Sequence, residues 1–315
     1  MESCSIDGKL YGVPANGYLS GIVYNKRLFE EAGVEKAPET WEELISSAKL
    51  LTNPAKQQSG FGLLTGQWVD WWFEFFVWQA GGDLTAKNAD GTMTCTFTDP
   101  AAIRAAEFYR QMKNEKVIQP DLTMDADTIN KNFAAGKIAM TIASIGDVRA
   151  HVSKGMKVED IGFAMFPKGP AGLNPSQFGG AMWVVSALSS KEHQEAAFLY
   201  NSFLSSRDQT IKNLQNEEAT GKASPALMVR NDINRIEFQP SLAGKEEFIN
   251  LLAEAQKTLQ LEYYGKGSVG KYIDNAVQKI LTDDKADIYT ELKKAQDLAE
   301  KEGAVEFNNA ILGIK

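Results

Sequence analysis

The chain has 315 residues, of which 43% are hydrophobic and 23% charged, so it is globular and long enough for one large or two ordinary domains. Its formal net charge of -8 argues against a nucleic-acid partner, because no basic field is present to attract phosphates. No stretch reaches the roughly 18 consecutive apolar residues that a membrane-spanning helix needs.

The cysteines and histidines give no sign of a disulfide scaffold or a metal site. Cys4 and Cys95 allow one bridge at most, and two unrelated thiols are the simpler interpretation. His151 and His193 lie far apart in helix-like segments, unlike the clustered ligands of a metal site. We therefore expect no metal and no cofactor.

The opening residues, MESCSIDGK, have neither the basic nor the apolar region of a signal peptide.

The first part of the chain predicts two short strands followed by two helices. The apolar runs LYGVP and IVYN read as strands, separated by a flexible segment of small residues, ANGYLSG. A helix over Lys26–Ala32 is expected to end at Gly33 in the left-handed conformation. Thr40 and Glu43 form a capping box at the start of the next helix, whose apolar positions follow helical spacing.

An aromatic segment, GQWVDWWFEFFVWQAGG, predicts a helix that Gly81 and Gly82 end. A short buried strand over residues 60–64 comes before it. Most of the aromatic stripe is expected to lie in the core, and the residues assigned there are Phe73, Phe76, Val77 and Trp78.

The remaining chain alternates short strands with helices. Asp99 and Pro100 suit the start of a helix, and Ser189 and Glu192 form a second capping box. Strands are expected at 137–143, 161–166 and 178–186, with helices dominating afterwards, one of them over 244–258. Such alternation favours α/β lobes on partly parallel sheets, and about five strands against nine or ten helices suggests that one lobe lacks strands.

Five segments, in the expected order, resemble the family 1 extracellular solute-binding proteins, the maltose-binding-protein-like sugar receptors of ABC importers. The resemblance covers most of the chain to about residue 285. The segments are DGKLYGVP, IVYNKRLFEEAGVEKAPETWEEL, FTDPAAIRAAEFYRQM, NKNFAAGKIAMTI and FGGAMWVVSALSSKEHQEAAFLYNSFLS.

The resemblance implies an α/β, helix-rich, two-lobe periplasmic-binding-protein-like (type II) fold. Its first lobe would be incomplete, because family members carry further βα units before DGKLYGVP. Residues 1–18 would end the first lobe and form the first hinge crossing, and 19–176 would form the second lobe. Residues 177–242 would form the second crossing and the rest of the first lobe, and 243–315 would be helices packing mainly on the second lobe.

The same resemblance implies a monomeric substrate-binding component that captures a sugar or oligosaccharide by hinge closure and delivers it to ABC permease membrane subunits. The full-length parent would be extracytoplasmic, either periplasmic or lipid-anchored at the cell surface. Sugar recognition needs aromatic faces and planar polar groups. The candidate ligand-binding residues are Asn16, Tyr18, Trp68, Asp70, Trp72, Ser144, Asp147, Gly180, Trp183 and Tyr264.

Each candidate also has a structural interpretation. Trp72 and Trp183 could be core residues, Ser144 or Asp147 could cap a helix, and Gly180 could only relieve strain. A glycoside-acting enzyme is a competing class, since Asp70 and the carboxylate four residues later would lie about 6 Å apart at Cβ. The chain contains no nucleophile elbow, phosphate loop or dinucleotide fingerprint. A third alternative is a fragment that binds no ligand because half of its cleft is absent.

Overall fold

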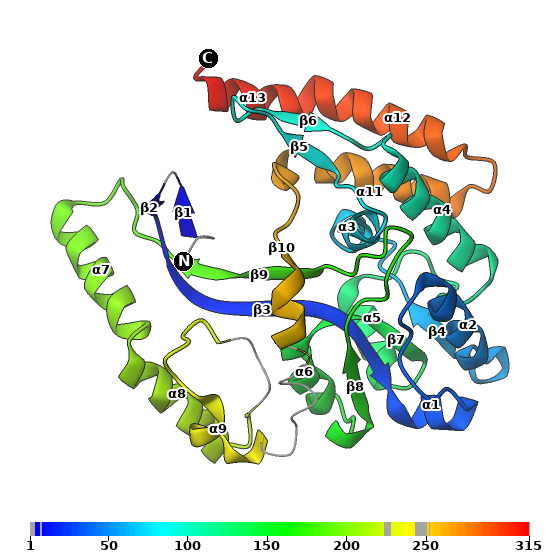
Figure 1. Ribbon diagram of the computed structural model, residues 1–315, viewed down its shortest axis with the longest axis horizontal. Coiled ribbons are helices and arrows are strands. Elements are labelled where there is room, and N and C mark those ends of the chain that lie inside the picture. Colours follow the sequence, from blue (N-terminus) through cyan, green and yellow to red (C-terminus); the bar gives the residue numbers. More distant parts are fainter. Residues whose placement is uncertain (1–3, 7, 224–227, 243–250, 252, 315) are drawn as a thin grey trace.

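The computed structural model describes residues 4–6, 8–223, 228–242, 251 and 253–314. Two unequal parts are joined by two long strands, β3 and β9 (Figure 1). The strands are β1 (Ser5–Ile6), β2 (Lys9–Leu10), β3 (Val13–Asn25), β4 (Ser59–Gly62), β5 (Thr85–Lys87), β6 (Met93–Cys95), β7 (Ile138–Ser144), β8 (Ile161–Ala164), β9 (Ser176–Trp183) and β10 (Leu259–Gln260).

The helices α7, α8 and α9 lie in the smaller part, and most of the others lie in the larger (Figure 1). The helices are α1 (Lys26–Ala32), α2 (Trp41–Leu51), α3 (Val69–Gln79), α4 (Pro100–Asn114), α5 (Ala126–Ala134), α6 (Val148–Ser153), α7 (Lys191–Leu204), α8 (Arg207–Ala219), α9 (Arg235–Phe238), α11 (Lys266–Thr282), α12 (Ile288–Ala299) and α13 (Val305–Leu312).

The central sheet has the strand order β10-β9-β3-β7-β4, and β8 also pairs with β3. The first half of β3 pairs antiparallel with β9, and its second half pairs antiparallel with β7 and β8. The pairs β4–β7 and β9–β10 are parallel. Because β3 changes partners halfway along, it connects the two parts of the molecule without a break.

The prediction of two strands with a flexible segment between them is wrong, since Val13–Asn25 is one strand of 13 residues. The middle of this strand pairs with the glycines of β9: Gly17 faces Gly180, and Tyr18 faces Gly179. A Cβ at Gly179 would lie 2.2 Å from Cζ of Tyr18, so glycine is what allows the tyrosine ring to lie across β9. The backbone ladder orders a segment that looks flexible in isolation.

The core of the larger part is built around α3, and the prediction of its core residues is confirmed. Phe73 and Phe76 each contact the Tyr109 ring of α4 edge-on, with centroids 5.2 Å apart. Trp41 of α2 stacks on Phe108 at 4.2 Å. The predicted core residues Phe73, Phe76, Val77 and Trp78 are all buried.

Local signals place most helix ends correctly. Gly33 follows α1 with a φ of 69°, as predicted. The Thr40 hydroxyl accepts a hydrogen bond from the Glu43 amide at 3.2 Å, but the Glu43 carboxylate accepts from the Glu39 amide instead of closing the box on Thr40. The cap of α7 is Ser190, one residue later than predicted.

The smaller part has little apolar core among the described residues. Its buried apolar side chains include Leu214, Ile233 and Leu242. The large apolar side chains of α7 are exposed by 56–68%, and they are Phe198, Leu199, Tyr200 and Phe203. The helix expected over 244–258 falls largely outside the described residues. The four-part division of the chain and the incomplete first lobe stay predictions.

Candidate ligand-binding cleft

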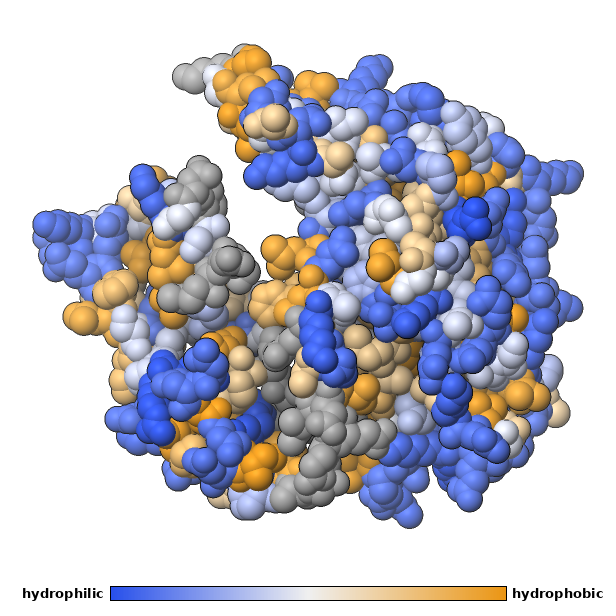
Figure 2. Space-filling view, viewed as in Figure 1, coloured by the Kyte–Doolittle hydropathy of each residue, from blue (hydrophilic) through white to orange (hydrophobic). Residues whose placement is uncertain are grey.

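Two adjoining pockets lie where β3 and β9 meet α3 and the start of α11. The larger has a volume of about 600 Å³ and the smaller about 310 Å³, and they share Tyr18 and Glu262 as lining residues. In the space-filling view, an open notch separates the two parts of the molecule (Figure 2). We name the two pockets together the cleft.

An exposed tryptophan stands at the edge of the larger pocket. Trp68 precedes α3 with a φ of 59°, a left-handed conformation that a bulky residue rarely adopts, and it has no side-chain cap bond. Its side chain is 59% exposed. A strained backbone that presents a large aromatic face to an open pocket is typical of a ligand site.

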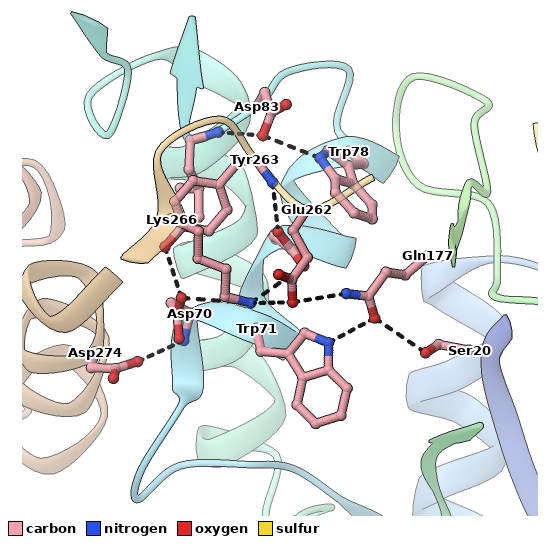
Figure 3. Close-up of polar contacts among 12 residues, drawn as sticks. Ser20, Asp70, Trp71, Trp78, Asp83, Gln177, Glu262, Tyr263, Lys266 and Asp274 are labelled. Carbon is pink, nitrogen blue, oxygen red and sulfur yellow. Dashed lines mark hydrogen bonds and ion pairs between the residues drawn. The ribbon is translucent and has the colours of Figure 1, made fainter. Parts of the chain in front are cut away.

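A lysine surrounded by carboxylates forms the charged centre of the larger pocket (Figure 3). Lys266 Nζ lies 2.9 Å from Glu262 Oε1, and 3.8 Å from both Asp70 Oδ2 and Glu74 Oε1. The ammonium also lies 6.0 Å from the centre of the Trp71 ring. One cation therefore holds together acidic groups from α3 and from the segment before α11.

A glutamine of β9 connects this charged centre to the aromatic wall (Figure 3). Trp71 Nε1 donates to Gln177 Oε1 at 2.7 Å, and Ser20 Oγ donates to the same oxygen at 3.3 Å. Gln177 Nε2 donates to Glu262 Oε1 at 3.1 Å. The two donors face the oxygen of the Gln177 amide and the carboxylate faces its nitrogen, which fixes the orientation of this amide and of the Trp71 indole.

Buried and half-buried acidic side chains lie in the lining of the larger pocket or next to it. Asp70 accepts a 2.7 Å hydrogen bond from the Tyr263 hydroxyl, and Asp274 accepts one of 2.7 Å from the Asp70 amide. Burial raises the pKa of Glu74 to about 9, so this carboxyl is uncharged at neutral pH, and its Oε1 has no hydrogen-bond partner among the described residues. Burial, reinforced by the Asp70 charge, raises the pKa of Asp274 to about 7.

Five of the ten residues predicted from the sequence line the cleft. Asn16 and Gly180 line the smaller pocket, where Asn16 Oδ1 accepts from the Ala181 amide at 3.0 Å. Burial, together with the charges of Glu262 and other carboxylates, raises the pKa of Tyr18. The five residues are Asn16, Tyr18, Trp68, Asp70 and Gly180.

The other five lie outside the lining of these two pockets, and their contacts explain why. Trp72 is buried in the core, and Trp183 lies half-exposed at the end of β9. Asp147 Oδ2 accepts from the Ser144 amide at 2.9 Å, which closes the turn after β7 on itself. The Tyr264 hydroxyl donates to the carbonyl of Gly91, which ties it to the β5–β6 hairpin.

Sequence reasoning does not single out Gln177, Glu262, Lys266 or Asp274, although all four shape the cleft. The one local signal is the spacing of Glu262 and Lys266 at i and i+4. Their role depends on chain segments about two hundred positions apart, as the Asp70–Asp274 contact illustrates. Across the described residues, no group of three His, Cys, Asp or Glu side chains could hold a metal ion.

A fold of two α/β parts joined by crossing strands, with an aromatic and acidic cleft at the junction, is that of the two-lobe ligand-binding proteins. Residues 3–211 match the model of the bacterial extracellular solute-binding protein family, and the chain belongs to this family. The predicted family and fold class are thereby confirmed. Family members are binding proteins. None of the helices in the described residues has the length and apolar character to cross a membrane.

Two relatives are similar to this chain in sequence, and a solved structure shares its fold. A putative binding protein of Brucella abortus is 28% identical over 87% of this chain and 68% of its own length. The diacetylchitobiose binding protein DasA of Streptomyces coelicolor is 25% identical over 71% of this chain and 56% of its own length. Maltose-bound MalE3 of T. maritima superimposes with a TM-score of 0.78 and 22% identity, covering 95% of this chain and 74% of that one.

Proposed function

We propose that this chain is the substrate-binding component of an ABC transporter, which captures a sugar or oligosaccharide in the cleft and delivers it to the membrane permease. The observation that carries the proposal is the exposed Trp68 ring, held by a left-handed backbone beside Trp71 and the carboxylate of Asp70. Two similar proteins support it, one a diacetylchitobiose binding protein and the other with maltose bound.

The chemistry of the cleft suits a carbohydrate. The apolar C–H face of a sugar ring packs against an indole, and ring hydroxyls donate to carboxylate oxygens or exchange hydrogen bonds with a phenol. Trp68 and Trp71 supply the aromatic faces, and Glu262 and Tyr18 supply polar atoms at the junction of the two pockets. We infer capture of the ligand by closure of the two parts about β3 and β9.

The cellular setting of the proposal follows from the family. The protein would work outside the cytoplasm, periplasmic or lipid-anchored, as a monomer that docks on the permease subunits. A glycoside-acting enzyme is less well supported, because Asp70 and Glu74 are only 4% and 0% exposed, and Lys266 lies 3.8 Å from a carboxylate oxygen of each. Buried carboxylates of this kind are poorly placed to reach both sides of a glycosidic bond.

Intrinsic tryptophan fluorescence tests the proposal. Titration with a panel of neutral mono- and oligosaccharides should shift the emission of the wild type with at least one sugar. Trp68→Ala should weaken the affinity for that sugar by about tenfold, which corresponds to ~1.4 kcal/mol of binding free energy. Trp183→Ala is the matched control, since this tryptophan is also exposed but lies outside the lining of the two pockets, and it should bind normally.

The outcomes of this titration separate the alternatives. Emission unchanged across the whole panel would contradict ligand binding and favour the fragment interpretation. Turnover of a labelled oligosaccharide would contradict the assignment as a binding protein and favour the enzyme. Equal losses in the Trp68 and Trp183 variants would show that the Trp68 platform is not the site.

A further inference from the structure

We infer that the cleft selects uncharged carbohydrates over phosphorylated or acidic ones, and that Glu262 determines this selectivity through its ion pair with Lys266. The inference rests on the proposed function and adds the charge class of the ligand. The argument comes from the charges of the larger pocket, where the cations are already compensated and the exposed Glu262 carboxylate remains open to hydroxyl donors.

Lys266 is the most central cation of the cleft, and it is not free to bind an anion. Its side chain is only 20% exposed, and the nearest carboxylate, that of Glu262, lies 2.9 Å away. Asp70 lies on another side at 3.8 Å. A phosphate or carboxylate on a ligand would have to replace these contacts, leaving a protein carboxylate with a lost partner in a partly buried site.

The remaining cation of the larger pocket is also engaged. Lys271 Nζ lies 4.8 Å from the centre of the Tyr272 ring, on the turn of α11 that follows Lys266. Arginine, the residue best suited to bidentate contact with phosphate or carboxylate, is absent from the described lining of both pockets. An anionic ligand would therefore find no preformed partner.

The acidic groups of the larger pocket also disfavour an anionic ligand relative to an uncharged one. Asp70, Glu262 and Asp274 all line the larger pocket. Asp274 accepts a hydrogen bond from the Asp70 amide at 2.7 Å, and burial, together with the nearby Asp70 charge, raises the pKa of Asp274. A further negative charge from a ligand would be repelled, whereas a sugar hydroxyl can donate to the accessible oxygens of Glu262 or Asp274.

Ligand pairs that differ only in charge test the inference. The wild type is titrated with maltose, N,N′-diacetylchitobiose and the 6-phosphate of each, at low and high salt, and with inorganic phosphate alone. A neutral sugar should bind at least about tenfold more tightly than its phosphate, and the gap should narrow at high salt because the repulsion is screened. Inorganic phosphate should not change the emission.

Glu262→Gln tests the residue assignment. Removing the nearest partner of Lys266 and one negative charge should improve the affinity for the phosphate, relative to that for its neutral parent, by roughly fivefold. Glu254→Gln is the matched control, because Glu254 also pairs with a lysine, Lys257 at 2.6 Å, but lies outside both pockets. It should leave the ratio unchanged.

The outcomes distinguish the two levels of the proposal. A phosphate that binds the wild type as tightly as its parent, or more tightly, overturns the charge selectivity but leaves sugar binding standing. An unchanged affinity ratio in Glu262→Gln overturns the role of Glu262. If none of the ligands binds, the proposed function fails, and the charge selectivity fails with it.

Discussion

The buried imidazole of His151 predicts that the protein loses stability between about pH 6.5 and about pH 4. His151 lies in α6, is 0% exposed, and neither of its ring nitrogens has a hydrogen-bond partner among the described residues. Its ring meets Phe133 edge-on at 4.8 Å between centroids. Burial lowers the pKa from 6.5 to about 4, while the charge of Asp147 opposes this shift and that of Lys154 adds to it.

The direction of the effect follows from where the proton binds. Between the folded-state pKa of about 4 and the unfolded value of 6.5, the unfolded chain binds more protons than the folded one. The free energy of unfolding therefore falls as the pH falls through this window, and the contribution is fully present above pH 6.5. At ~1.36 kcal/mol for each pKa unit, the full loss is about 3 kcal/mol.

Urea unfolding of the wild type and His151→Leu, at about pH 7 and about pH 4.5, measures this contribution. Carboxylates titrate in both proteins, so the informative quantity is the difference between their losses. The wild type should lose about 2 kcal/mol more than the variant. His193→Gln is the control, because His193 is the second of the 2 histidines and is exposed. Equal losses in the wild type and His151→Leu would refute the reasoning.

Two further predictions concern the crossing strands. Gln177→Glu places a carboxylate against Glu262 at a buried position. Ligand affinity, measured by fluorescence titration, should be about tenfold weaker than that of the wild type at neutral pH and should recover as the pH falls. A loss of affinity that does not depend on pH would contradict this prediction. Gly180→Ala would bring a Cβ to 2.3 Å from the backbone oxygen of Asn16, costing about 1–3 kcal/mol in urea unfolding, whereas Gly267→Ala, with no neighbour within 4 Å, should cost nothing.

Local features of the sequence were sufficient to predict many elements of the fold. The aromatic stripe of α3 and the glycine after α1 act within a few residues, so their consequences appear in a short window. The continuity of β3 could not be read in this way. Its glycine-containing middle is ordered by pairing with β9, about 160 residues later, and Gly17 facing Gly180 is invisible to any local pattern.

Half of the candidate site residues line the cleft, and Trp72 illustrates a residue whose position helical spacing could not establish. Treating Trp68 as helical places Trp71 or Trp72 on its face of the helix, at i+3 or i+4. Trp68 is instead a left-handed residue before the helix begins, so Trp71 in the first turn lines the pocket and Trp72 turns into the core. The periodicity of apolar residues cannot predict a left-handed backbone at a tryptophan, because this conformation is rare for bulky residues.

Glu262 has the most consequential position in the cleft, because it lines both pockets and is bonded to both sides of the junction. Lys266 connects it to α11, and Gln177 connects it to β9 and, through the amide, to the Trp71 indole. A ligand hydroxyl that donates to Glu262 from either pocket would compete with one of these bonds. We therefore expect the orientation of the Trp71 indole in the larger pocket to respond to occupancy of the smaller one, through Glu262, Gln177 and Trp71, which come from three separate stretches of the sequence.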